Sequence, residues 1–171
     1  MQNLTTKKLV LTALLMALTF VATMLVRIPL PPGYVNLGDM FVLLSVFILG
    51  PVLGTVAGGV GSCLADLIGF IPYVPGTLII KSAMALVAYL IYSLLLKATK
   101  KDILAEIIGG ICGAVIMAFG YFFYEILFFE TAGVAIVNVP WNLLQGAVGV
   151  ILSTIIMRIL DATKVLEKLQ K

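Results

Sequence analysis

Six apolar segments follow one another along this chain, and they constrain its fold more than any other feature. The segments cover residues 6–27, 37–49, 52–71, 77–96, 103–129 and 139–160. The hydrocarbon core of a bilayer is about 30 Å thick, and a helix of about 20 apolar residues crosses it. The sequence therefore predicts an all-α membrane protein, a bundle of six transmembrane helices that forms one integral membrane domain over residues 1–171.

The composition leads to the same expectation. Of the 171 residues, 62% are hydrophobic and 11% are charged, and the mean hydropathy is +1.20. A soluble domain carries about a quarter charged residues. A soluble fold could not hide this much apolar surface from water, so a multi-pass location in the cell membrane is expected.

The second segment is shorter than the others. About 13 residues cover only about 20 Å at 1.5 Å per residue. We therefore expect this helix to be tilted or shielded by its neighbours. Gly50 and Pro51 separate it from the third segment, which predicts a tight helical hairpin.

The basic residues are distributed unevenly between the two ends of the predicted bundle. With six spans, both termini lie on one side. That side holds nine basic residues: Lys7, Lys8, Lys97, Lys100, Lys101, Arg158, Lys164, Lys168 and Lys171. The other side holds two, Arg27 and Lys81. Because basic residues accumulate in cytoplasmic loops, both termini are expected to be cytoplasmic.

The sequence lacks the residues and motifs of most enzymes. It has no His, which is the usual general base and the commonest metal ligand. It has no Gly-rich phosphate loop that leads to Lys and Ser or Thr, so it is not expected to bind ATP. The net charge of +3 comes from Lys residues at segment ends, which is not a nucleic-acid-binding stripe. We expect no enzyme activity, cofactor, bound metal or nucleic acid.

Polar residues within the segments gather near the end opposite the termini. Because charge in hydrocarbon is costly, such residues are expected to be paired or functional. Tyr121 and Glu125 are four residues apart and share a helix face, as do Asn138, Asn142 and Gln145. A cavity with an apolar frame and a few convergent polar groups is the general form of a small-molecule site. The predicted substrate-binding residues are Asn36, Asp39, Asp66, Tyr73, Lys81, Tyr121, Glu125, Trp141, Asn142 and Gln145.

Structural roles stay open for several of these residues. Asp66 and Lys81 could form an ion pair between adjacent segments, and Asp39 could cap the second segment. Trp141 and the tyrosines could belong to an interfacial aromatic belt. Polar groups within a span need partners in lipid, so a binding role is the first hypothesis for three residues: Glu125, Asn142 and Gln145.

Small residues recur at helical spacing, which lets helices approach closely in lipid. Most are expected to pack inside the bundle, and they include Gly54, Gly58, Gly61, Ala65, Gly69, Gly109, Gly113, Gly146, Gly149 and Ser153. Ala13 and Ala17 differ, because they lie in the cytoplasmic half of the first segment and no polar residue of the candidate site shares their face. This pair is the candidate for contact with an external partner.

Several motifs, taken in their order and spacing, resemble a known family. They are ALLMA (13–17), YVNLGD (34–39), LGPVLG (49–54), GSCLADL (61–67), PGTLIIK (75–81) and NVPWNLLQ (138–145). Together with six segments in 171 residues, they resemble the substrate-capture (S) components of energy-coupling factor (ECF) vitamin transporters. The resemblance covers essentially the whole chain.

The resemblance implies a function and partners. Such proteins capture a vitamin or its precursor at the outer face, and they associate with a transmembrane coupling subunit and two cytoplasmic ATPases. By the same resemblance, Ala13 and Ala17 would dock on the coupling subunit, and residues 28–36 would act as a lid. The subgroup it most resembles includes carriers of pyridoxine-like and hydroxymethylpyrimidine-like compounds, with riboflavin carriers nearby.

The candidate residues suit a small polar heteroaromatic ring. Tyr73, Tyr121 or Trp141 could stack on such a ring. The amides of Asn142 and Gln145 could hydrogen-bond its nitrogens or hydroxyls. One Lys beside two or three carboxylates argues against a polyanionic ligand such as a phosphate ester.

Two other function classes stay open. A self-sufficient secondary carrier could use Asp66, Lys81 and Glu125 as an ion relay. Such carriers often show inverted repeats with a site at the midplane, whereas no convincing repeat relates the two halves of this chain and its polar groups lie at one end. A structural or assembly protein would show no ligand-dependent thermal shift.

Overall fold

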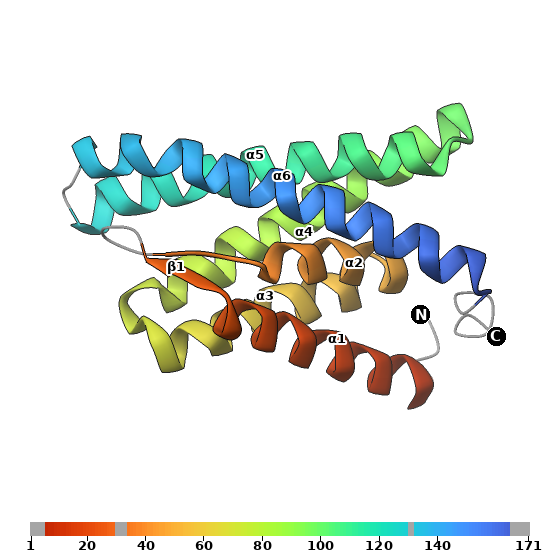
Figure 1. Cartoon of the computed structure of the whole chain (residues 1–171), viewed down its shortest axis with the longest axis horizontal. Helices are drawn as coiled ribbons and strands as arrows, with labels where there is room; N and C mark the ends of the chain where they lie inside the picture. The colour runs from red at the N-terminus through yellow and green to blue at the C-terminus, as the bar shows by residue number, and fades with distance from the viewer. Residues whose placement is uncertain (1–5, 30–33, 130–131, 165–171) are drawn as a thin grey trace.

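The structure is a computed structural model of the chain, and it describes residues 6–29, 34–129 and 132–164. The described part is almost entirely α-helical, which confirms the expected class (Figure 1). In chain order the elements are α1 (Thr6–Leu25), β1 (Arg27–Pro29), β2 (Tyr34–Asn36), α2 (Gly38–Leu49), α3 (Pro51–Gly69), the short 3-10 helix η1 (Ile71–Tyr73), α4 (Val74–Thr99), α5 (Asp102–Phe129) and α6 (Ala132–Ala162).

Five of the described helices, all except α2, are long and apolar enough to cross a membrane. Helix α2 has 12 residues, which cover about 18 Å at 1.5 Å per residue. It packs against α1, α3, α4 and α6, and eight of its 12 residues are buried. The expectation that neighbouring helices shield the short segment is therefore confirmed.

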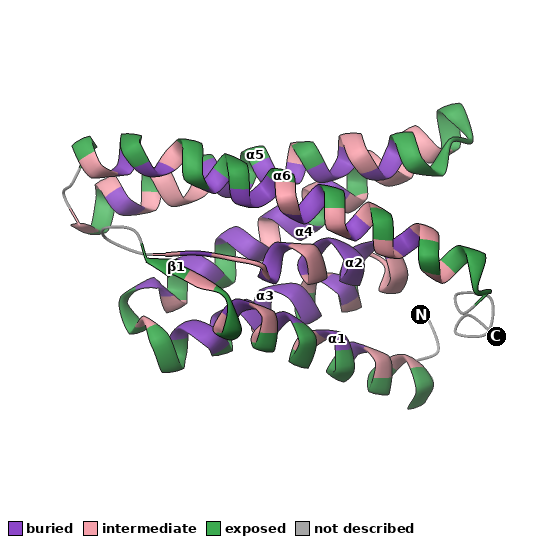
Figure 2. Cartoon of the chain, viewed as in Figure 1, coloured by how far each residue is buried: buried purple, intermediate pink, exposed green. Residues whose placement is uncertain are grey.

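The other helices form a chain of neighbours around α2. Helix α1 packs on α3, α3 on α4, α4 on α5, and α5 on α6, which returns to α2. Buried residues lie on the sides of these helices that face one another, and exposed residues lie on the outer sides (Figure 2). The largest buried apolar cluster joins α2, α4, α5 and α6 through residues such as Leu43, Met84, Met117 and Val150.

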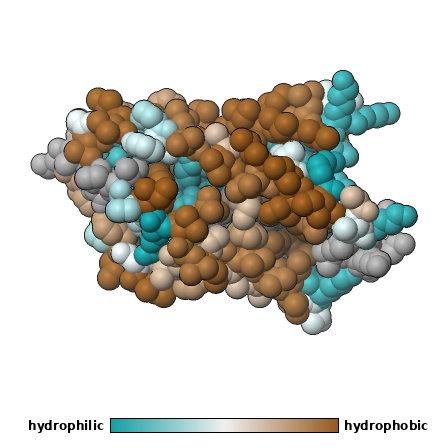
Figure 3. All heavy atoms as spheres, in the orientation of Figure 1, coloured by the Kyte–Doolittle hydropathy of each residue, from teal (hydrophilic) through white to brown (hydrophobic). Residues whose placement is uncertain are grey.

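The start of α1, the turn between α4 and α5, and the end of α6 lie at one end of the molecule (Figure 1). On the visible face, hydrophobic side chains cover the middle of the bundle, and hydrophilic ones gather at that end (Figure 3). This distribution is the one expected when the apolar middle faces lipid. Strands β1 and β2 lie toward the opposite end (Figure 1).

The hairpin between α2 and α3 depends on two residues at its turn. Gly50 has a φ of 82°, a left-handed conformation that an L side chain rarely adopts. Pro51 follows at the first position of α3, where its missing N–H costs no hydrogen bond. The predicted tight hairpin at this pair is confirmed.

The small residues let neighbouring helices touch through their backbones. A Cβ on Gly61 would lie 2.6 Å from the Met16 carbonyl oxygen of α1, and one on Gly113 would lie 2.8 Å from the Met84 oxygen of α4. A Cβ on Gly146 would lie 2.4 Å from the Cβ of Ala114. The expectation that these small residues pack inside the bundle is confirmed for these positions.

Two boundaries differ from the sequence prediction. Helix α6 begins at Ala132 rather than near residue 139, and it continues through Pro140. Proline removes one backbone hydrogen bond, yet it is tolerated in membrane helices where neighbours satisfy the freed carbonyl. The region after α1, where the resemblance implied only a lid, also contains regular structure: Arg27–Pro29 and Tyr34–Asn36 pair as antiparallel strands. Two three-residue strands flanking a Pro-rich connection give no alternating pattern long enough to predict them.

Candidate functional site

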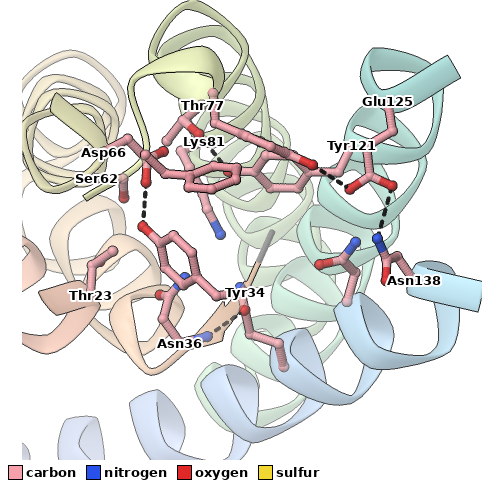
Figure 4. Close-up of a pocket in the computed structure, with 14 residues that line it drawn as sticks. Thr23, Tyr34, Asn36, Ser62, Asp66, Thr77, Lys81, Tyr121, Glu125 and Asn138 are labelled. Carbon is pink, nitrogen blue, oxygen red and sulfur yellow. Dashed lines mark hydrogen bonds between the residues drawn. The ribbon is translucent and has the colours of Figure 1, made fainter. Parts of the chain in front are cut away.

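A cavity of about 30 Å³ lies between the ends of the helices near strand β2. Every helix except α2 contributes to its wall, as do β2 and η1 (Figure 4). The lining residues are Thr23, Tyr34, Asn36, Ser62, Asp66, Phe70, Tyr73, Thr77, Lys81, Tyr121, Glu125, Asn138, Asn142 and Gln145.

A buried ion pair forms one side of this cavity. Lys81 of α4 is 2% exposed, and its ammonium group pairs with the carboxylate of Asp39 on α2. The amide nitrogen of Gln145 donates to the other Asp39 oxygen over 2.7 Å, and the Gln145 oxygen accepts from the backbone N–H of Asn36 over 2.7 Å. This chain of contacts ties β2, α6, α2 and α4 together through the side chains of Gln145, Asp39 and Lys81 and the backbone of Asn36.

Strand β2 is also tied to α3. The phenol of Tyr34 donates to the Asp66 carboxylate (Figure 4). Burial, followed by the nearby Asp66 charge, raises the pKa of Tyr34 well above its ordinary value, which keeps the phenol protonated as a donor. The Arg27 guanidinium lies 4.6 Å from the centroid of the Tyr34 ring and donates to the Ala65 carbonyl over 3.0 Å. Gly69 leaves the space for Arg27, because a Cβ there would lie 1.8 Å from its Nη1.

Glu125 of α5 forms the opposite side of the cavity. It is 3% exposed. One carboxylate oxygen accepts from the Tyr73 phenol and the other from the Asn138 amide, both over 3.1 Å (Figure 4). Both donors are neutral, unlike the cation that pairs with Asp39.

Aromatic rings cover the remaining wall. Tyr73 lies 5.1 Å from Phe70 and 6.0 Å from Tyr121 between ring centroids. The Lys81 nitrogen lies 5.5 Å from the Tyr121 centroid, within reach of a cation–π contact. Tyr121 also hydrogen-bonds to Thr77 over 2.9 Å. These contacts fix the rings without a ligand, so their faces are held in place for stacking.

Two polar side chains that line the cavity have no hydrogen-bond partner among the described residues. They are the hydroxyl of Ser62, which is 1% exposed, and the amide of Asn142, which is 8% exposed. Buried polar groups are normally satisfied. Two such groups in one small cavity are therefore what a site for a polar ligand requires.

The comparison with known families agrees with this geometry. A family model described as "ECF-type riboflavin transporter, S component" matches residues 3–162. The chain belongs to this family. The S component is also similar to a protein of Pyrococcus woesei described as "Uncharacterized protein in gap 3'region". The two are 34% identical over 134 residues, which cover 77% of the S component and 86% of its relative. The resemblance found from the sequence motifs is therefore confirmed at the level of the family.

The structure of the S component brings most of the predicted site residues together. Eight of the ten line the cavity: Asn36, Asp66, Tyr73, Lys81, Tyr121, Glu125, Asn142 and Gln145. Asp39 lies behind the lining and contacts it through Lys81 and Gln145. Trp141 is 43% exposed and lies on another face of α6, where it borders an apolar groove with Val26, Leu37 and Leu144.

Two structural roles expected from the sequence are wrong. Lys81 pairs with Asp39 rather than with Asp66, because α2 lies between helices and presents Asp39 to α4. Asp39 does not cap α2: the N-cap residue is Leu37, which makes no side-chain cap, and the side-chain oxygen of Asn36 accepts from the backbone N–H of Gly38 instead. The positions of Asp39, Asp66 and Lys81 in the sequence do not show which of the two carboxylates lies next to the lysine, because this depends on how α2 packs between the other helices.

Several lining residues of the S component were not predicted. They are Thr23, Tyr34, Ser62, Phe70, Thr77 and Asn138. Asn138 shares a helix face with Asn142 and Gln145, and this spacing could have predicted it as a site residue. Tyr34 is brought in by a strand that was not expected. Thr23, Ser62 and Thr77 are small hydroxyl residues that are common in apolar helices, where they often bind their own backbone.

Ala13 and Ala17 lie away from the cavity. Both are exposed, whereas the buried residues of α1 are Thr12, Leu15, Thr19 and Thr23. The small-residue face of α1 is therefore open on the outside of the bundle. The sequence-based lid, residues 28–36, lies only in part within the described residues, because 30–33 fall outside them.

Proposed function

We propose that this S component captures a small water-soluble vitamin or vitamin precursor at the outer face of the cell membrane, for ATP-driven import by an ECF complex. One observation carries the proposal. The polar groups of five helices and a strand converge on one cavity, in which Ser62 and Asn142 have hydrogen-bonding groups without partners. Membership of the family supports a vitamin-type substrate.

The lining favours a small heteroaromatic ring. Tyr73 and Tyr121 offer ring faces for stacking, and the amides of Asn142 and Gln145 offer donors and acceptors. The ligand classes that we propose are pyridoxine-like or hydroxymethylpyrimidine-like compounds, and also riboflavin, which the family description names.

Binding of such a ligand requires the cavity to widen. The volume of about 30 Å³ holds about one or two waters, whereas small-molecule sites typically measure about 300–1,000 Å³. Strand β2 is the element that would move, because it is attached to the helices by few contacts. Two of them are the hydrogen bonds of Tyr34 to Asp66 and of Asn36 to Gln145.

The proposed orientation places the cavity outside and both termini in the cytoplasm. The excess of Lys and Arg at the end with the α4–α5 turn supports this orientation. A transmembrane coupling subunit and two cytoplasmic ATPases are the proposed partners. The exposed pair Ala13 and Ala17 on α1 would give the coupling subunit a smooth surface for close helix contact.

A self-sufficient carrier is the less favoured function. A second buried charge, Glu106, pairs with Arg158 toward the other end of the bundle. The apolar cluster of α2, α4, α5 and α6 lies along these helices between that pair and the cavity, so apolar packing separates the two groups of buried charges. Measuring uptake of the ligand in cells that lack ECF ATPases distinguishes the carrier from the ATP-dependent function. Transport there would support the carrier and contradict the ATP-dependent function.

The binding function is tested by thermal shift and calorimetry on the purified protein with a panel of B vitamins and their precursors. A vitamin-type compound should raise the melting temperature. Asn142→Ala should weaken its binding by about 10-fold or more, since it removes a hydrogen bond to the ligand. Gln145→Ala should weaken it as much, since it also removes the contacts that hold Asp39 and Asn36 at the cavity. Ser153→Ala is the matched control. Ser153 lies on the same helix, is buried, and bonds only to the Val150 carbonyl of α6. Unchanged affinity in both site variants would contradict the proposed pocket.

A further inference from the structure

The charges around the cavity do not balance. Only two basic residues occur between Lys8 and Lys97, namely Arg27 and Lys81, and none occurs between Lys101 and Arg158. Three carboxylates lie at the cavity, on α2, α3 and α5. Lys81 pairs with the carboxylate of Asp39. After this pair is set aside, one basic residue, Arg27, is left for two carboxylates, those of Asp66 and Glu125.

Arg27 compensates the carboxylate on α3. Its guanidinium stacks on the Tyr34 ring, whose hydroxyl donates to Asp66, and it donates to the Ala65 carbonyl next to Asp66. Lys81 and, less strongly, Arg27 also act electrostatically on Asp66 itself. This assignment uses the last cation at this end of the molecule.

Glu125 has no cation. No described residue forms an ion pair with it, and its two hydrogen-bond donors, Tyr73 and Asn138, are neutral. The undescribed residues 30–33 and 130–131 include no Lys or Arg, so they cannot supply one. An isolated carboxylate in a buried, low-dielectric position is unfavourable unless a positive charge is brought to it or it takes up a proton.

The surroundings of Glu125 suit a cationic nitrogen. Tyr73 donates to the carboxylate through its hydroxyl, and its ring lies 6.0 Å from that of Tyr121, so two aromatic rings line the cavity on the side of this charge. Aromatic faces attract cations through their negative quadrupole. The unpartnered amide of Asn142 lines the same cavity, and it offers an independent contact for the remainder of a ring. A carboxylate, aromatic faces and a free amide together form a site for an aminated aromatic compound.

We propose that the ligand of this S component carries a positively charged or protonatable nitrogen in, or attached to, its aromatic ring system, and that Glu125 is the counter-ion of that nitrogen. The inference rests on the proposed capture function and narrows its substrate class. It disfavours riboflavin, whose ring system is neutral, and favours aminated pyridines and aminopyrimidines. If Glu125 instead holds a proton, the cavity is charge-balanced and prefers neutral ligands.

The experiment compares matched pairs of probes that differ in the amine alone. The pairs are pyridoxamine with pyridoxine, and 4-amino-hydroxymethylpyrimidine with its 4-oxo analogue; riboflavin is added as a neutral vitamin. Affinities are measured by calorimetry on the full chain in detergent. The tightest probe should be an aminated one, about 10-fold or more tighter than its partner, as expected for a charge-assisted hydrogen bond.

Glu125→Gln should remove this preference, because it keeps the shape and loses the charge. Glu106→Gln is the matched control on the same helix and should keep the preference. If the tightest probe is neutral, or if the preference survives in Glu125→Gln, the inference is overturned and the capture function stands. If no probe binds, the capture function itself is contradicted. If Glu125→Gln cannot be purified in a folded state, the order of the probe affinities measured on the unaltered protein decides whether the inference holds.

Discussion

Replacement of Lys81 by Met tests the energetic role of the ion pair between α4 and α2. Met has a similar length and no charge, so the change leaves the Asp39 carboxylate buried without its cation. Both side chains are nearly inaccessible, at 2% and 1%, so solvent cannot compensate for the loss. Breaking one partner of a buried pair costs about 3–5 kcal/mol. Gln145 still donates to Asp39, so we expect a value toward the lower end of this range.

The cost is measured as a change in melting temperature in detergent without ligand. At about 2–4 °C per kcal/mol for a chain of this size, a cost of about 3 kcal/mol means that Lys81→Met should lower the melting temperature by roughly 6–12 °C. The double variant Asp39→Asn with Lys81→Met removes both charges and should recover most of the loss, because replacing a buried ion pair by neutral groups is often close to neutral. Lys97→Met, at an exposed position of the same helix, should change stability by less than about 0.5 kcal/mol. A Lys81→Met protein as stable as the Lys97 control would refute the reasoning.

Three further changes test the packing, the strand and the partner surface. Gly146→Val should destabilise the protein by about 1–3 kcal/mol in thermal unfolding, because it overpacks the contact with Ala114; Gly133→Ala, where a Cβ meets nothing within 4 Å, should be neutral or slightly stabilising. Tyr34→Phe removes a donor to a buried carboxylate and should cost about 1–3 kcal/mol in the same assay, and full stability would show that the strand is not held there. Ala17→Trp should block co-purification with the coupling subunit while ligand affinity stays unchanged; loss of the ligand instead would mean that this face is internal.

The membrane class and the position of the site could be predicted because they depend on local properties. Hydrophobic length decides whether a segment enters the bilayer, and helical spacing decides which residues of one segment share a face. For this reason Tyr121 with Glu125, and Asn142 with Gln145, were correctly expected to point into one region. The turn at Gly50 and Pro51 is local for the same reason, since it depends on the conformations that these two residues allow.

The partners of the charged residues could not be predicted in this way. Asp66 and Lys81 lie on consecutive long helices, yet Lys81 pairs with Asp39 from the short helix. Trp141 is adjacent in sequence to a lining residue but lies outside the cavity, because one step along a helix turns a side chain by about 100°. Tyr34 reaches the cavity only because β2 pairs with β1 and passes over it.

The sequence by itself determined that this chain is helical, lies in a membrane, and gathers its polar side chains at one end, because length, hydropathy and spacing act within each segment. The tertiary structure alone decided that Lys81 pairs with Asp39 and that Glu125 is bound, among the described residues, by neutral donors and by no cation. That outcome depends on the rotation and depth of every helix. Those are set by contacts between helices, such as the close approach at Gly61, Gly113 and Gly146, that no single segment contains.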